Sequence, residues 1–139
     1  MIKKMAAVGI GGGFGALARY LIGLAFVTEA GKFPGTTFAI NLFGCLFLGW
    51  FFTVTSERLP VAPGLRLFVG TGFTGAFTTF SAFSVETVRL FERGQPGLAL
   101  LYSLGSVVCG LLLAGAGIVL GRAGQAWKRP ASAERGDHE

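Results

Sequence analysis

The stretch from Gly70 to Phe83, GTGFTGAFTTFSAF, decides how the rest of the chain is interpreted. It places three glycines, four threonines, a serine and four phenylalanines within fourteen residues of an otherwise apolar chain. Glycine weakens a helix, and polar groups at membrane depth need a partner or a water-filled cavity. A continuous helix facing lipid is therefore a poor fit. A broken helix, buried against protein or lining a water-filled cavity, fits better.

The composition of the chain is that of an integral membrane protein. Of its 139 residues, 52% are hydrophobic and 14% are charged, whereas soluble domains contain about 25% charged residues. Cys45 and Cys109 lie in apolar runs, where we expect them to pack as small hydrophobic residues. The single histidine, His138, is next to last in a polar tail, so neither a histidine base nor a histidine metal site is available. Most hydrolytic chemistry is thereby disfavoured, and the chain is not expected to be an enzyme.

Prolines divide the chain into intervals that each contain one apolar run, close to the roughly 20 residues that cross a bilayer. This pattern predicts an all-α membrane protein with four transmembrane helices in a single domain, residues 1–121. The polar segment 122–139 is expected to be a disordered tail. The expected spans are 5–27, 35–55, 65–90 and 97–121.

The N-terminus also has features of a secretory signal, because Lys3 and Lys4 precede an apolar stretch that contains an A-x-A-like sequence. The apolar run continues past Arg19 to Val27, which favours a retained helix.

No nucleic-acid partner is expected; the expected partners are membrane lipid and a second copy of the chain.

Small residues recur at a spacing of four, which lets helix backbones approach closely in lipid. A bundle of four short spans is thin for a pore, so self-association as a dimer is expected. The glycine pairs with this spacing are Gly9 and Gly13, Gly11 and Gly15, and Gly117 and Gly121.

Asn41 and Arg19 are polar residues inside expected spans. The Asn41 amide could form a helix-to-helix hydrogen bond or donate to a ligand, and its position favours neither. Arg19 lies about 12 Å from the end of the first span at 1.5 Å per residue. It either caps backbone carbonyls, the favoured interpretation, or attracts an anion toward a vestibule.

Three further polar residues lie in the last two spans. Glu86 could form an ordinary helix-surface pair with Arg89, which is the favoured interpretation, or face a cavity. Tyr102 and Ser106 lie four residues apart and so share a face of the last helix, which raises the chance of a polar track.

Phe77, Phe80 and Phe83 repeat every three residues, a spacing that ordinarily indicates core or lipid contact. Hydroxyl groups interleave with these rings, and ring edges carry partial positive charge. Rings and hydroxyls together could replace the water shell of a small anion without a fixed cation. A break in this helix also leaves free carbonyls that can hold a cation.

Three blocks of the sequence resemble the signature blocks of the Fluc, or CrcB, fluoride channels. They are GGGFGALARY at 11–20, GTTFAINLFG at 35–44 and TGFTGAFTTFSAFSVE at 71–86. The resemblance implies a passive, fluoride-selective channel that exports fluoride from the cytoplasm across the bacterial inner membrane. It also implies an antiparallel, dual-topology dimer of four-span subunits, with the third helix broken at mid-membrane and a central structural Na⁺.

The same resemblance implies roles for individual residues. The carbonyls of Gly75 and Thr78 would bind Na⁺, and Arg19 matches the basic residue of the first block. The pore residues would be Asn41, Phe80, Ser81, Phe83, Glu86, Tyr102 and Ser106.

Ala82 departs from the common pattern of the family, which has threonine there. One hydroxyl donor is thereby lost beside the pore, and we expect altered conductance with selectivity retained.

The charge distribution bears on orientation in the membrane. The side that carries both termini has eight basic residues, and the other side has three. Without the three in the trailing tail, the count is five against three, a weak preference for a cytoplasmic N-terminus. The chain is therefore expected to form a homodimer, with a paired homologous subunit of opposite orientation as the alternative.

Two other functions were compared with the channel. A proton-coupled small multidrug exporter also has four spans, but it needs a carboxylate in its first helix, and residues 5–27 contain none. A subunit that only packs would leave the cluster of phenylalanines and hydroxyls unexplained.

Overall fold

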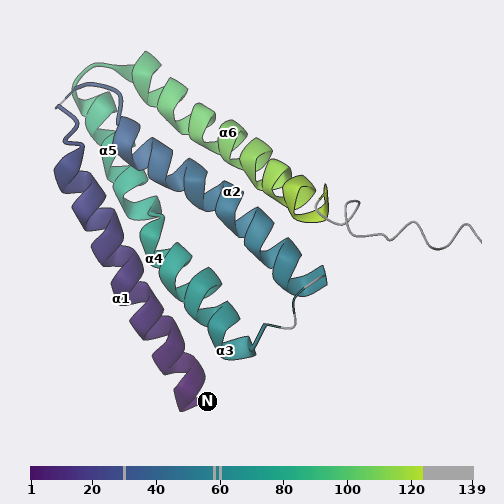
Figure 1. Ribbon diagram of the computed structural model, residues 1–139. Helices are drawn as coiled ribbons and strands as arrows, with labels where there is room; N and C mark the ends of the chain where they lie inside the picture. Colours follow the sequence, from purple (N-terminus) through teal and green to yellow (C-terminus); the bar gives the residue numbers. More distant parts are fainter. Residues whose placement is uncertain (30, 58, 60, 124–139) are drawn as a thin grey trace, which may run out of the picture.

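The computed structural model describes residues 1–29, 31–57, 59 and 61–123. Within these residues the protein is helical and contains no strand. Two long helices are followed by four short helical pieces and then by one long helix (Figure 1). The helices are α1 (Ile2–Ala25), α2 (Gly35–Glu57), α3 (Pro63–Arg66), η1 (Leu67–Thr74), α4 (Gly75–Phe77), α5 (Phe80–Glu92) and α6 (Pro96–Ala123).

Helices α1, α2 and α6 are long and apolar enough to cross a membrane. The expectation of an all-helical membrane protein is thereby confirmed, and the bounds of these helices lie close to those of the first, second and fourth expected spans. Arg122 and Ala123, which we expected in the tail, are the last residues of α6. The rest of that tail, 124–139, lies outside the described residues.

The third expected span, 65–90, corresponds to the four short pieces α3, η1, α4 and α5. The piece η1 is a π-helix of eight residues, which the sequence pattern did not predict. The wider turn of a π-helix joins each residue to the fifth one before it. The Thr74 hydroxyl has the same spacing, since it donates to the carbonyl oxygen of Val69 at 2.8 Å.

The helices pack as two pairs. Helix α1 lies along η1 and α4, and α2 lies along α6 (Figure 1). The pairs lie close together where α1 ends and α6 begins, and they diverge toward the N-terminus of α1 (Figure 1). Helix α5 contacts α6 near the end where the pairs are close.

Glycine allows the close approach in the first pair. A Cβ atom on Gly11 would collide with the carbonyl oxygen of Phe68, and one on Gly15 would collide with that of Phe73. Gly9 and Gly13 instead face open space, so within one chain they do not contribute to this packing.

Glycine has the same role between α2 and α6. A Cβ atom on Gly117 would collide with the carbonyl oxygen of Leu46, and one on Gly121 would approach Thr53 Cβ to 2.7 Å. The expected packing function is thus confirmed for Gly11, Gly15, Gly117 and Gly121.

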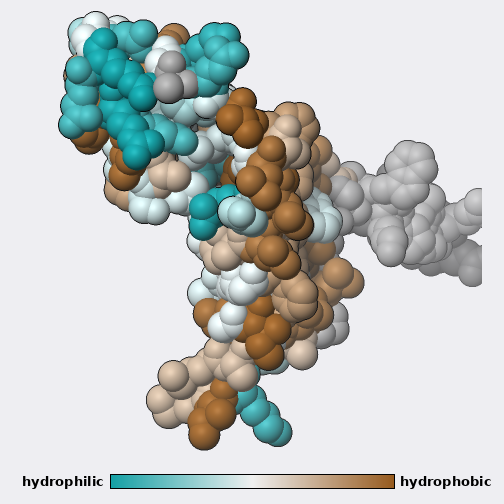
Figure 2. Space-filling model, turned by 90° about the vertical axis from the view of Figure 1, so that its left-hand side faces the viewer, coloured by the Kyte–Doolittle hydropathy of each residue, from teal (hydrophilic) through white to brown (hydrophobic). Residues whose placement is uncertain are grey.

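The surface of the described chain is divided by polarity. Figure 2 shows a hydrophilic end and, below it, a largely apolar face with a few hydrophilic residues in the middle and at the lower end. Few large side chains are buried within one chain. A small core at the hydrophilic end contains Leu90, Ala99 and Tyr102. An apolar surface of this extent is suited to lipid and to further protein contacts.

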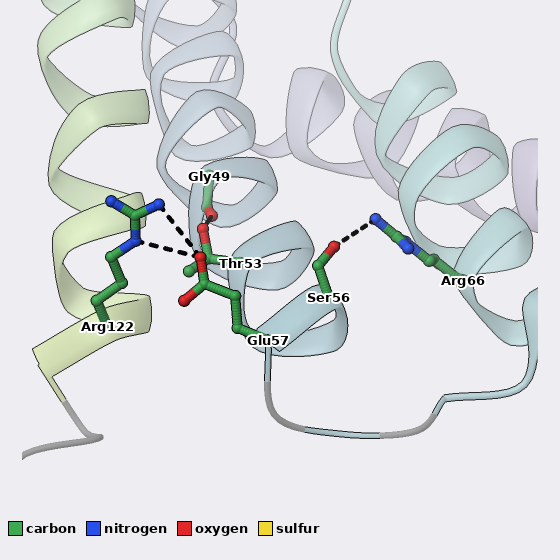
Figure 3. A network of polar contacts seen from close by, with 6 residues as sticks. All are labelled: Gly49, Thr53, Ser56, Glu57, Arg66 and Arg122. Atoms are coloured by element: carbon green, nitrogen blue, oxygen red, sulfur yellow. Dashed lines mark hydrogen bonds and ion pairs between the residues drawn. The ribbon is translucent and has the colours of Figure 1, made fainter.

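The opposite end is held by polar contacts among α2, α3 and α6 (Figure 3). Arg122 pairs with Glu57 at 3.2 Å, and Arg66 donates to the Ser56 hydroxyl at 2.7 Å. The Arg66 guanidinium also lies 5.2 Å from the centre of the Phe52 ring. These contacts join the end of α2 to both of its neighbours.

Candidate ion-binding site at the helix interruption

Two residues with extended backbone, Thr78 and Thr79, separate α4 from α5. Thr78 has φ −73° and ψ 159°, and Thr79 has φ −148° and ψ 120°. Asn41 of α2 binds Thr79 twice: its Nδ2 donates to Thr79 O at 3.0 Å, and its Oδ1 accepts from Thr79 N at 2.8 Å. The side-chain amide of Asn41 therefore binds both backbone groups of Thr79, as a backbone peptide group of a neighbouring segment would.

Two carbonyl groups at the interruption lose their ordinary helical partners. In an α-helix each carbonyl accepts from the amide four residues later. For Gly75 this amide would be that of Thr79, which donates to Asn41 instead. For Thr78 it would be that of Ala82, which donates to the Thr79 hydroxyl at 3.1 Å and so caps α5. These are the two carbonyls that the sequence resemblance implicates in cation binding.

Arg19 of α1 reaches the same interruption. Its Nε donates to the carbonyl oxygen of Ala76 at 3.2 Å. This contact corresponds to the capping interpretation of Arg19. The residue also lines a cavity of about 220 Å³ between α1, α2 and α5, on whose wall Thr37, Thr79 and Ala82 also lie.

A cavity of about 290 Å³ lies beside the interruption, on the side of α2 and α6. Its lining includes Asn41, Phe80, Phe83 and Ser106, together with Thr78 and Thr79. The cavity is a groove open to the outside, and Phe80 at its edge is 78% exposed. Its lining residues carry no formal charge.

This groove continues along α2. Cys45 and Leu48 line both the cavity beside the interruption and a second one of about 520 Å³. The second cavity extends between α2 and α6 to Ser56 and Glu57. The two cavities together form one long groove on this face of the chain, which we call the α2–α6 groove.

Aromatic rings connect the α2–α6 groove to the hydrophilic end. The ring of Phe83 lies 5.6 Å from that of Phe80 and 5.2 Å from that of Tyr102, measured between centroids. Ser106 donates to the carbonyl oxygen of Tyr102 at 2.7 Å, and its hydroxyl oxygen can still accept a hydrogen bond.

Glu86 is bound by two hydroxyl groups. Thr37 of α2 donates to its Oε1 at 2.7 Å, and Tyr102 of α6 donates to its Oε2 at 2.7 Å. Tyr102 is fully buried. The favoured pairing with Arg89 was wrong, because within the described part of the chain no ion pair joins the two residues. Glu86 instead joins α5 to α2 and α6 and lines a cavity of about 190 Å³ at the hydrophilic end.

The structure does not bring all the candidate residues together. Ser81 is exposed and lies outside the lining of the groove, with its hydroxyl oxygen 3.2 Å from that of Thr79. Phe77 is buried against Phe43 and Phe73, away from the groove. Asn41, Phe80, Phe83 and Ser106 do line one groove, while Glu86 and Tyr102 lie beyond its Phe83 end.

Comparison with known proteins identifies the family to which this arrangement belongs. The family model described as "CrcB-like protein, Camphor Resistance (CrcB)" matches residues 6–118, which is most of the chain. The chain belongs to the CrcB-like family. All the candidate residues discussed above lie within the matched range. The chain is therefore a multi-pass membrane protein.

Proteins from several bacteria are similar to this chain over most of their length. A protein of Acidobacterium capsulatum named "Fluoride-specific ion channel FluC" is 44% identical over 119 residues, which cover 85% of this chain and 95% of the relative. A protein of the same name from Agrobacterium fabrum is 42% identical over 120 residues, or 86% and 96% of the two chains. "Fluoride-specific ion channel FluC 1" of Moorella thermoacetica is 47% identical over 115 residues, or 81% of each chain.

Two residues of the site were missed by sequence reasoning. Thr37 binds Glu86, and Thr79 binds Asn41 and caps α5. Both lie inside the CrcB-like signature blocks. The signal for Thr37 was the Thr-Thr pair one turn before Asn41, which places a hydroxyl and the amide on the same side of α2.

Proposed function

We propose that this chain is a fluoride-specific channel that conducts fluoride passively from the cytoplasm and so relieves its toxicity. The names of the CrcB-like relatives support an ion channel rather than an enzyme. The observation that carries the proposal is the uncharged cavity beside the interruption, in which Asn41 lies beside the rings of Phe80 and Phe83. Conduction requires binding that is favourable enough for entry and weak enough for exit, and a fixed cation would hold the anion too strongly.

The groups in the groove suit a dehydrated anion. The Asn41 amide nitrogen carries two hydrogens, of which one donates to Thr79 and one remains for a ligand. The edges of the Phe80 and Phe83 rings carry partial positive charge. These groups would replace part of the hydration shell of fluoride on its way past the interruption.

Beyond Phe83, the route would continue along Tyr102 and Ser106 toward Glu86. The Tyr102 and Thr37 hydroxyls hold Glu86 in place through both carboxylate oxygens. A hydroxyl can rotate from a carboxylate to an arriving anion, so Thr37 and Tyr102 are the groups that would receive fluoride next to Glu86. Ser81 would serve as a further hydroxyl donor near the interruption.

We further propose that segment 63–92 crosses the membrane as a third span that is broken at mid-membrane, so that the chain has four spans. Its length and apolar character support this. Two copies would then form an antiparallel, dual-topology dimer in the bacterial cytoplasmic membrane, surrounded by lipid. The second copy would cover the open side of the α2–α6 groove and provide its missing wall.

A structural Na⁺ is proposed at the centre of this dimer. The carbonyls of Gly75 and Thr78 fit such an ion, because their helical amide partners donate to side chains instead. The described residues contain no cluster of carboxylate, histidine or cysteine side chains that could hold a metal. The ion would join the two copies, each of which would contribute the same two carbonyls.

The test is fluoride efflux from liposomes that contain the purified chain, recorded with a fluoride electrode and with chloride efflux as the control. We expect fluoride flux without chloride flux. Absence of fluoride flux, or equal flux of both ions, would contradict the proposal. Phe80→Ile and Phe83→Ile should each impair flux and leave the dimer intact on size-exclusion chromatography; normal flux in both variants would exclude the rings from the route.

Orientation requires a separate test. Cys45 and Cys109 are first replaced by serine, and a single cysteine is then introduced at either end of the chain. Labelling with an impermeant thiol reagent from one side of the membrane should reach about half of the molecules at each end. Labelling of each end from one side only would exclude the dual-topology homodimer and favour a paired subunit.

A further inference from the structure

The cavity of the hydrophilic end is lined by charged side chains that have no part in the proposed route. This cavity of about 190 Å³ lies between the loop that precedes α2 and the last turns of α5. Glu86 lies on its wall, so it adjoins the route proposed for fluoride. Its other charged lining residues are Glu29, Lys32, Arg89 and Arg93.

The positive charges of this cavity are not all neutralised. Lys32 and Glu29 form an ion pair at 2.7 Å and largely cancel each other. The carboxylate of Glu86 accepts from the hydroxyls of Thr37 and Tyr102. Arg89 and Arg93 form no ion pair with any residue that the structure describes. Because the hydroxyl partners of Glu86 carry no charge, the lining holds three positive and two negative charges, and Arg89 and Arg93 supply its net positive charge.

We infer that Arg89 and Arg93 make this cavity a positively charged entrance that concentrates small anions at the Glu86 end of the route. The inference rests on the proposed function and names the residues that govern anion entry. Charges of one sign that line a concave site raise the local concentration of the opposite ion and its rate of entry. Because the cavity is open to the outside, the attraction acts through charge alone, and fluoride would not be held there.

Attraction of this kind depends on ionic strength. Screening lengths are about 30 Å at 0.01 M salt and about 3 Å at 1 M. The experiment measures the initial rate of fluoride efflux from neutral liposomes at both ionic strengths, with a salt whose anion does not pass the channel. The full-length chain is used, with fluoride below saturation.

The main variant is Arg89→Gln with Arg93→Gln. Its initial rate should be roughly three- to tenfold below that of the wild type at 0.01 M salt and equal to it at 1 M salt. The charge-conserving variant Arg89→Lys with Arg93→Lys should keep the wild-type rate at both ionic strengths. Equal rates for the glutamine variant and the wild type at low salt would overturn the inference, as would a loss that persists at 1 M salt.

Two further variants control for sign and for net charge. Glu29→Gln leaves Lys32 without its partner and should raise the rate at low salt by about twofold. Lys3→Gln with Lys4→Gln removes two positive charges from exposed positions at the start of α1, outside the cavity lining and at the other end of the same chain, and should change nothing. A decrease in the Lys3/Lys4 variant equal to that of the arginine variant would show an effect of net charge alone and overturn the inference. Failure of the proposed function differs from all of these outcomes, because the wild type would then show no fluoride flux at either ionic strength.

Discussion

The interrupted segment from Pro63 to Glu92 and the continuous helix α6 hold their polar groups in different ways. In α6 the hydroxyls bond within the helix: Ser103 donates to Ala99 O at 2.9 Å, and Ser106 donates to Tyr102 O at 2.7 Å. At the interruption, groups from two other helices are required. Asn41 of α2 binds Thr79, and Arg19 of α1 binds Ala76.

Carbonyl groups are available for binding a ligand at the interruption and not along α6. Along α6 almost every carbonyl is occupied by an amide of the same helix, so none is free for an ion. At the interruption the amides of Thr79 and Ala82 donate to side chains, which leaves the carbonyls of Gly75 and Thr78 for a ligand. The stability of the interrupted segment therefore depends on its tertiary contacts with α1 and α2.

The largest effect is expected where that dependence is greatest. Asn41→Leu removes both bonds to Thr79 and leaves the Thr79 amide without a partner, at about 1–3 kcal/mol. We expect loss of fluoride flux and a clearly lower melting temperature in detergent. The matched variant Ser103→Ala removes a bond within α6 and should keep both flux and stability. A stable, conducting Asn41→Leu protein would show that the interruption does not depend on α2.

A smaller effect is expected from Gly15→Ala, which places a methyl group against the carbonyl oxygen of Phe73. Overpacking typically costs about 1–3 kcal/mol, and here α1 would move away from η1 and α4. Thermal unfolding in detergent measures the loss. Gly13→Ala is the control, since a Cβ atom at Gly13 meets nothing within 4 Å in the chain. Equal stability of the two variants would contradict the close packing of α1.

A still smaller effect is expected from Ala82→Thr, in the first turn of α5. A threonine here would add a hydroxyl to the cavity that contains Arg19, Thr37 and Thr79. We expect a change of a few-fold in fluoride flux with selectivity over chloride retained, because Asn41 and the rings are untouched. Liposome efflux beside the wild type measures it. Identical rates would show that the missing hydroxyl has no part in conduction.

The smallest effect is expected at the end of α6. Arg122→Gln breaks the pair with Glu57, whose side chains are 64% and 36% exposed. Exposed pairs contribute about 0–1 kcal/mol, so the melting temperature should change little and fluoride flux should stay the same. A large loss of flux would place this polar network in the permeation route, contrary to the proposed route past Asn41 and Phe83.

The long helices could be predicted from the sequence because their apolar runs have the length of a bilayer and end near prolines. The π-helix could not, since glycine and threonine in 67–74 are also compatible with an ordinary helix, and the wider turns form where η1 packs against α1. Local composition does not encode that contact.

The candidate site shows the same limit. Asn41 and Glu86 were identified because polar groups inside apolar spans are costly. The hydrogen bonds that these two residues form were not predicted, because Thr79 is 38 residues from Asn41 and Tyr102 is 16 residues from Glu86. The favoured pairing of Glu86 with Arg89 considered only one helix, whereas two hydroxyls from α2 and α6 bind the carboxylate.

The open α2–α6 groove predicts how a mutant allele behaves beside a normal one. A single chain supplies one wall of this groove, and Phe80 at its edge remains 78% exposed. In the proposed dimer every route would be lined by two copies, so a defective copy would disable routes that it shares with a normal one. A mutant allele such as Asn41→Leu, if its product still assembles, should then behave as dominant negative when expressed beside the normal allele. A channel enclosed within one chain would make the same allele recessive.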